Sequence, residues 1–155
     1  MAESFSLVVN IITLVDIAAR TLAVGSPYTS SARGHAAQVR LLVQEIHTMS
    51  GVLTAVATML QSNDRTTDYA KLVTLIGGPL QECTTQLSDL HSLLVKQVSG
   101  RNKWIRMGRH LKWPMKEKET IALIERIGRL QRSISLALHA EDLYVTSGPW
   151  RSWRD

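Results

Sequence analysis

The sequence predicts an all-α fold, a bundle of four or more main helices with an additional short basic amphipathic helix. Apolar residues recur three and four positions apart in nearly every segment, which is the spacing of one helix face. Clusters of Gly, Pro, Ser, Asn and Asp separate these segments, as expected for turns. The chain has 155 residues, of which 45% are hydrophobic, so a single domain can bury a full core.

The first helix is predicted over residues 4–24, a nearly continuous apolar segment. Its polar residues Asn10, Thr13, Asp16 and Arg20 are spaced three, three and four apart and form one narrow polar stripe. A helix this apolar must be surrounded by protein or by lipid. We expect a central core helix in the resting state, because Asp16 and Arg20 would each cost about 2.5–3.5 kcal/mol at the centre of a bilayer. The apolar residues that would enter lipid are Leu7, Val8, Ile11, Ile12, Leu14, Val15 and Ile17.

A second helix is predicted over 34–61, followed by a third that begins near Thr67. Gly77, Gly78 and Pro79 interrupt the third helix. Proline removes an amide donor and clashes with the preceding turn, so the sequence predicts a kink or a break before Leu80. The apolar stripe then resumes and includes Cys83, which is expected to be a buried small residue rather than a nucleophile.

Positive charge is concentrated in one part of the chain. Residues 96–132 carry eleven Lys and Arg against three Asp and Glu, whereas residues 1–95 carry five against seven. Residues 101–112 have the pattern of a short basic amphipathic helix. A local charge of this size can attract an anionic surface over about one Debye length, although a solvated helix face is an equally open interpretation. The predicted anionic-surface patch comprises Lys103, Trp104, Arg106, Arg109, Lys112 and Trp113.

The last helix is predicted to start at Pro114 and to end near Asp142, with Glu117 and Glu119 in its first turns. Its inward stripe begins at Ile121, and Arg126, Arg129 and Arg132 make its outer face basic. Across all the helices, eight residues are predicted to be buried: Val9, Ile12, Ile46, Leu53, Leu87, Leu90, Ile127 and Leu130.

Patterns of catalysis or cofactor binding are lacking in the sequence. Its five histidines are scattered, with neither HExxH nor Cys/His metal-ligand spacing. There is no phosphate-binding P-loop motif and no GxSxG. We therefore expect no enzyme activity, no metal, no cofactor and no small-molecule substrate. A single cysteine and an N-terminus without signal-peptide character favour the cytoplasm.

Several segments together suggest a family: 77–83 (GGPLQEC), 111–119 (LKWPMKEKE), Ile124 with Ile127, and 133–139 (SISLALH). In these segments the chain resembles the N-terminal helical domain of fungal STAND (NLR-type) proteins, of the HeLo-like group. The resemblance covers nearly the whole chain, and the Leu-Lys-Trp-Pro block is its most specific part. It implies a HeLo-like bundle over residues 1–145 and a tail or the start of a linker over 146–155.

The resemblance also implies a function. In that family the domain precedes a nucleotide-binding module and induces programmed cell death in innate immunity and heterokaryon incompatibility. It implies self-association on activation and relocation from the cytoplasm to an anionic plasma membrane. Two alternatives remain open: an adaptor domain that recruits another protein without membrane activity, and a basic helical domain that binds nucleic acid, although no recognised nucleic-acid motif is present.

Overall fold

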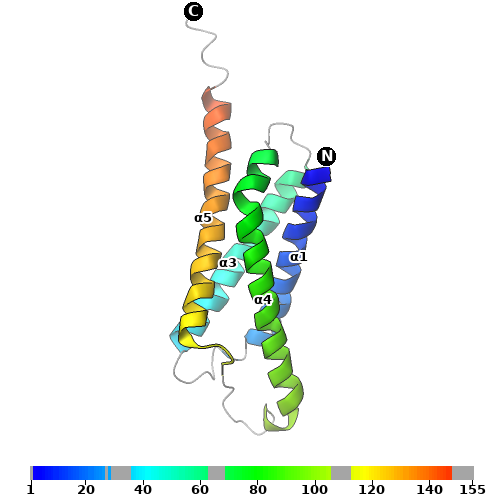
Figure 1. Cartoon of the computed structure of the whole chain (residues 1–155), viewed down its shortest axis with the longest axis vertical. Coiled ribbons are helices and arrows are strands. Elements are labelled where there is room, and N and C mark those ends of the chain that lie inside the picture. The colour runs from blue at the N-terminus through cyan, green and yellow to red at the C-terminus, as the bar shows by residue number, and fades with distance from the viewer. Residues whose placement is uncertain (1, 27, 29–35, 63–68, 106–112, 148–155) are drawn as a thin grey trace, which may run out of the picture.

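Among the residues that the structure describes, four long helices make up the fold, as a computed structural model of the chain shows (Figure 1). The structure describes residues 2–26, 28, 36–62, 69–105 and 113–147. The helices are α1 (Ala2–Gly25), α3 (Ala36–Gln61), α4 (Tyr69–Ile105) and α5 (Glu117–Ser147). No strand occurs among the described residues. The predicted all-α bundle is therefore confirmed.

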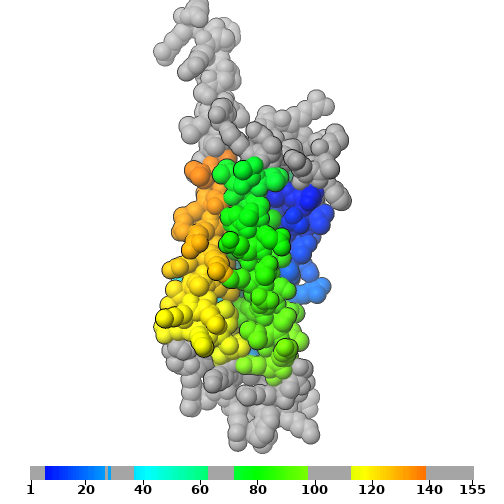
Figure 2. All heavy atoms as spheres, in the orientation of Figure 1, coloured from blue at the N-terminus to red at the C-terminus, as the bar shows by residue number. Residues whose placement is uncertain are grey.

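The helices occupy the four corners of the bundle. α1 packs against α3 and α4, and α5 packs against the same two helices, so α1 lies diagonally opposite α5. α1 and α4 run in one direction and α3 and α5 in the other (Figure 1). Figure 2 shows α4 on one face of the molecule, with α5 on one side of it and α1 on the other. The chain thus crosses the bundle diagonal between α3 and α4.

One continuous hydrophobic core fills the space between the helices, and each helix contributes a stripe at three- and four-residue spacing. Six of the eight residues predicted to be buried are buried: Ile46, Leu53, Leu87, Leu90, Ile127 and Leu130. The prediction was wrong for Val9 and Ile12, whose exposed fractions are 43% and 49%. Both lie on the side of α1 that faces away from α3 and α4, because α1 is a corner helix and not the central helix that its apolar sequence predicted.

The sequence predicts a kink or a break before Leu80; the helix α4 continues through Pro79, so there is no break at this point. Proline inside a helix costs about 3 kcal/mol or more. Core residues on both sides of Pro79, namely Leu72 and Ile76 before it and Leu80 after it, are buried on the same face of α4. Their packing against the rest of the bundle offsets that cost and keeps the two halves in one helix.

The boundaries of α5 differ from the prediction at both ends. The helix begins at Glu117, after Pro114, and extends to Ser147, five residues beyond Asp142. Glu117 and Glu119 lie in its first turn as predicted, and the Glu119 carboxylate accepts a hydrogen bond from the Lys116 amide at 3.2 Å. This contact satisfies an amide donor at the helix start. Ile121 was expected to face inward but is 41% exposed, because Thr120 and Leu123 take the core side of that turn.

Candidate functional site

The helix α1 is the first part of the candidate site because its sequence is largely apolar and its exposed side includes large apolar residues such as Val9 and Ile12. Its segment Ser6–Gly25 is long and apolar enough to cross a membrane by length and composition, and only 28% of it is buried in the bundle. A core helix of similar composition would be mostly buried. Of the predicted lipid-entering residues, Leu7, Ile11 and Leu14 are buried, Val8, Val15 and Ile17 are half-buried, and Ile12 is exposed.

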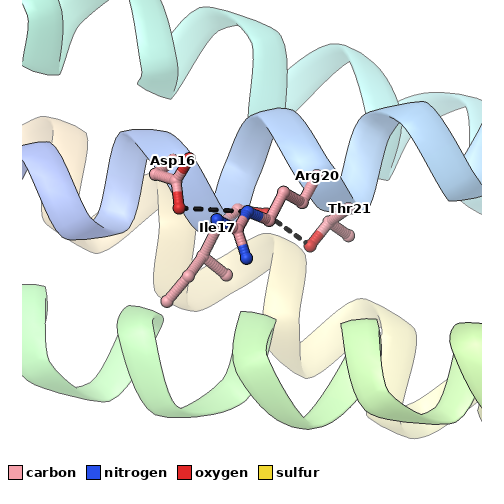
Figure 3. Close-up of polar contacts among 4 residues, drawn as sticks. All are labelled: Asp16, Ile17, Arg20 and Thr21. Atoms are coloured by element: carbon pink, nitrogen blue, oxygen red, sulfur yellow. Dashed lines mark hydrogen bonds and ion pairs between the residues drawn. The ribbon is translucent and has the colours of Figure 1, made fainter.

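The predicted polar stripe lies on the solvent side of α1, where Asn10, Thr13, Asp16 and Arg20 are all exposed. Arg20 Nε lies 3.1 Å from Asp16 Oδ2, with 67% and 55% of the two side chains exposed (Figure 3). This confirms the i,i+4 pair expected from the sequence. An exposed pair of this kind adds only a few tenths of a kcal/mol to the stability of the bundle in water.

The threonines of α1 also have partners within the helix. Thr13 Oγ1 donates to the Val9 carbonyl at 2.8 Å, and Thr21 Oγ1 donates to the Ile17 carbonyl at 2.7 Å (Figure 3). The ion pair and both hydroxyls are therefore satisfied without any contact to α3 or α4. This matters for a helix that would leave water, because unsatisfied polar groups are costly in hydrocarbon.

The predicted anionic-surface patch is only partly within the described residues. Lys103 and Trp104 lie in the last turns of α4, and their side chains are outside the described part of the chain. Arg106, Arg109 and Lys112 also lie outside the described residues. Farther along the chain, Arg129 and Arg132 are exposed on α5, and Arg126 is half-buried. The basic outer face predicted for this helix is thus present at two of its three arginines.

Trp113 does not belong to that patch, because it is 7% exposed and lies in the core. Its indole Nε1–H donates to Thr120 Oγ1 at 3.0 Å. Its ring meets the Tyr28 ring edge-on, with centroids 5.6 Å apart and planes at 77°, a favoured aromatic geometry. The Tyr28 hydroxyl in turn donates to Gln97 Oε1 at 3.0 Å. Trp113 thus joins the segment after α1, the helix α4 and the start of α5.

Sequence reasoning assigned Trp113 to the surface because four cations precede it within ten residues, at Lys103, Arg106, Arg109 and Lys112. The residues of the network that it missed are Tyr28, Gln97 and Thr120. A signal was present in Trp113-Pro114, since the residue before a proline is usually extended and ends a helix. A large aromatic residue at such a helix start often packs against the core, and its indole N–H then needs a partner.

Cys83 is fully buried on α4, as predicted. Burial, and to a smaller extent the charge of Glu82, raise the pKa of its thiol to about 11, while Arg126 opposes the shift. The thiol is therefore protonated at neutral pH. Because the folded-state pKa is above the ordinary value of 9.0, the associated stability is present below pH 9 and is lost as the pH rises toward about 11.

We expect native Cys83 to resist alkylation by iodoacetamide at pH 8, since a thiolate is the nucleophile and this thiol is both buried and protonated. In denaturant the same cysteine should react at the rate of a free thiol. Mass spectrometry of alkylated samples at intervals measures both rates. Equal rates in buffer and in denaturant would show that α4 does not bury the thiol.

The described residues contain no cluster of three or more His, Cys, Asp and Glu side chains able to hold a metal ion. The fold and surface define an all-α four-helix bundle with an uncovered apolar edge helix. No protein-family model, curated protein or solved structure matches this chain.

Proposed function

We propose that this chain is the N-terminal effector domain of a fungal NLR-like protein, which oligomerises and permeabilises a membrane through α1 to kill the cell. The observation that supports the proposal best is α1 itself. It is apolar, long enough to span a bilayer, 28% buried, and its ion pair and both threonine hydroxyls are satisfied within the helix. A helix with these properties can exchange its contacts with α3 and α4 for contacts with lipid.

The position of the charge pair explains why oligomerisation is needed. Asp16 lies at the middle of the Ser6–Gly25 segment and Arg20 lies in its C-terminal half. A single inserted helix would therefore place both charges in the hydrocarbon. On insertion scales each charge costs about 2.5–3.5 kcal/mol at the centre. Intrahelical pairing lowers that cost, and several helices assembled together can turn Asp16, Arg20 and Asn10 toward one another or toward water.

The basic residues within 101–112 would determine the direction in which α1 inserts into the membrane. The C-terminal ends of α1 and α4 lie at the same end of the bundle (Figure 1). Lys103 belongs to the last turn of α4, and Arg106, Arg109 and Lys112 follow this helix in the sequence. Each suitably placed cation contributes about 1 kcal/mol of attraction to an anionic cytoplasmic leaflet. The end of α1 near Gly25 would therefore stay with the basic residues on the cytoplasmic side, while the N-terminal half of α1 crosses.

Dye release from vesicles tests the proposal. The protein is fused to a chemically induced oligomerisation module, and vesicles of phosphatidylcholine and phosphatidylserine are loaded with a self-quenched dye. We expect release only when the inducer is added, and less release from vesicles of phosphatidylcholine alone. Induced oligomers that bind the vesicles and release no dye would contradict membrane permeabilisation.

A second prediction concerns the four cations at positions 103, 106, 109 and 112. Replacing all four with Glu should abolish sedimentation with anionic vesicles, because the attraction becomes repulsion. The melting temperature should barely change if the side chains are on the surface, where substitutions usually fall within about 0.5 kcal/mol.

A control variant with the same change in net charge replaces Lys116, Lys118, Arg129 and Arg132 with Glu; these residues are exposed at the start and on the outer face of α5. A larger fraction of this control variant should sediment with anionic vesicles than of the variant changed at positions 103, 106, 109 and 112. Equal losses in both variants would mean that net charge alone governs binding, and unchanged binding of the first variant would make the segment a solvated surface only.

An adaptor function is the second candidate. Leu136 on α5 is 63% exposed, the highest value among the exposed large hydrophobic residues, and Arg132 lies one turn before it on the same helix. An apolar side chain beside a cation suits an acidic amphipathic helix of another protein. Loss of cell killing in Leu136→Asp, with vesicle dye release unchanged, would favour the adaptor function.

A further inference from the structure

The solvent face of α1 carries a stripe of exposed residues at regular spacing. Val9, Ile12, Asp16, Ala19 and Ala23 are all exposed, and they are spaced three, four, three and four residues apart. We call these five residues the α1 stripe. This is the heptad spacing of the a and d positions that pair two helices in a coiled coil. It lies opposite the core stripe of α1, which contains Leu7, Ile11, Leu14 and Ala18.

Side-chain size changes along the α1 stripe. Its N-terminal half has two large apolar residues, Val9 and Ile12, which are 43% and 49% exposed. Its C-terminal half has two alanines, Ala19 and Ala23. Well-packed helix pairs place large side chains opposite small ones. A stripe with large side chains at one end and small side chains at the other is complementary to a copy of itself that runs in the opposite direction.

The charges select the same orientation. In an antiparallel pair centred between residues 17 and 18, Ile12 faces Ala23 of the second copy. In that register Asp16 lies beside Ala19 and Arg20 of the second copy, so each acid meets a base across the contact. In a parallel pair, Asp16 would meet Asp16 and Ile12 would meet Ile12. Like charges opposed at a helix contact are destabilising.

We propose that two copies of this chain associate through the α1 stripe, with their α1 helices antiparallel and related by a two-fold axis between residues 17 and 18. The contact is isologous, so each Asp16–Arg20 pair is joined by the same pair from the other copy. A single helix pair buries less than a standard interface of about 1,600 Å², so the dimer is weak and concentration-dependent. It covers Val9 and Ile12 in water and leaves the core untouched.

This inference goes beyond the proposed function and is independent of it, because the contact forms between folded bundles without lipid. It gives α1 two competing partners. While the α1 stripe is paired with a second copy, its apolar surface is unavailable to a bilayer, and the antiparallel arrangement directs the two N-termini apart. The dimer is therefore a resting form, and the parallel assembly needed to cross one membrane from one side requires that it first dissociate.

Sedimentation velocity over a concentration series tests the contact with charge-reversal variants. The wild-type protein should shift from monomer to dimer as concentration rises. Asp16→Arg alone and Arg20→Asp alone should each remain monomeric, because each brings like charges together across the contact. An equimolar mixture of the two variants should dimerise again. Both side chains are more than half exposed, so each variant should retain the wild-type helical circular dichroism.

Cysteine cross-linking tests the orientation. Ile12→Cys and Ala23→Cys proteins are oxidised separately and as a mixture; wild type, whose Cys83 is buried, is the control. An antiparallel pair should give disulfide-linked dimers strongly in the mixture and weakly in either variant alone. A parallel pair would link Ile12→Cys to itself and would overturn the proposed orientation.

One further result would overturn the dimer itself, namely a wild-type protein that stays monomeric at its highest soluble concentration. Dye release that fails while the mixed charge variants still dimerise would instead contradict the membrane proposal alone.

Discussion

Replacing Trp113 with alanine should lower the free energy of unfolding by about 3–5 kcal/mol, the usual cost of deleting a buried tryptophan side chain. Trp113 is 7% exposed, packs edge-on against Tyr28 and donates to Thr120. Its removal leaves a cavity where three segments of the chain meet. For a domain of this size each kcal/mol corresponds to roughly 2–4 °C in melting temperature. Urea denaturation followed by circular dichroism measures the loss.

Two control variants separate the contributions. Trp113→Phe retains an aromatic ring against Tyr28 and loses the hydrogen bond to Thr120, and the lost hydrogen bond alone should cost about 0.5–1.5 kcal/mol. Leu136→Ala removes a large apolar side chain that is 63% exposed and should stay within about 0.5 kcal/mol of wild type. If Trp113→Ala unfolds at the same urea concentration as Leu136→Ala, then Trp113 is not a core residue.

The helices and most of the core were predictable because a helix that buries one face must repeat apolar residues at that spacing. The second helix was predicted over 34–61 and is observed as Ala36–Gln61. The core stripe of α3 contains Ile46 and Leu53, as predicted, and the core stripes of α4 and α5 contain Leu87 and Ile127. The polar stripe of α1 was also predictable, since Asp16 and Arg20 are four residues apart and their side chains meet on one helix face.

These errors have one physical cause: the sequence does not show which distant segments pack against each residue. Val9 and Ile12 were predicted to lie in the core because an apolar residue in water is unfavourable, yet among the described helices α1 packs mainly against α3 and α4, and its side with Val9 and Ile12 is exposed. Trp113 was placed outside because its chain neighbours are basic, although the contact that buries it comes from Tyr28, 85 positions earlier in the sequence. Pro79 was expected to kink or break α4, but the helix is continuous through it, because tertiary packing on either side outweighs the local propensity of proline.

The membrane proposal requires a variant that acts on α1 in lipid and spares the soluble bundle. Deleting residues 1–20 would remove Leu7, Ile11, Leu14 and Ala18 from the core, so loss of activity would have two explanations. Leu14→Arg has the same defect because Leu14 is fully buried. Asn10 is exposed on the polar side of α1 and lies outside the α1 stripe. An arginine there should leave both the fold and the dimer unchanged.

In lipid the same arginine is costly. An arginine at the bilayer centre costs about 2.5–3.5 kcal/mol on insertion scales, and Asn10 lies about 8 Å from the middle of the Ser6–Gly25 segment at 1.5 Å per residue, so this figure is an upper bound for each subunit. Every copy in the oligomer carries the substitution, so the arginines at position 10 either lie in hydrocarbon or, where the helices turn this side toward one another, repel each other. We therefore expect Asn10→Arg to reduce dye release and cell killing by the induced oligomer sharply, while solubility and circular dichroism stay as in wild type.

Leu41→Arg is the matched control, because Leu41 is 45% exposed on α3 and the substitution adds the same charge to a helix that does not enter lipid. This variant should permeabilise vesicles as well as wild type. If both variants lose activity equally, the added charge acts on the bundle surface and not on insertion. If a folded Asn10→Arg oligomer kills cells as efficiently as wild type, α1 does not enter the bilayer, and the uncovered surface of the bundle must then serve a protein partner, as in the adaptor function.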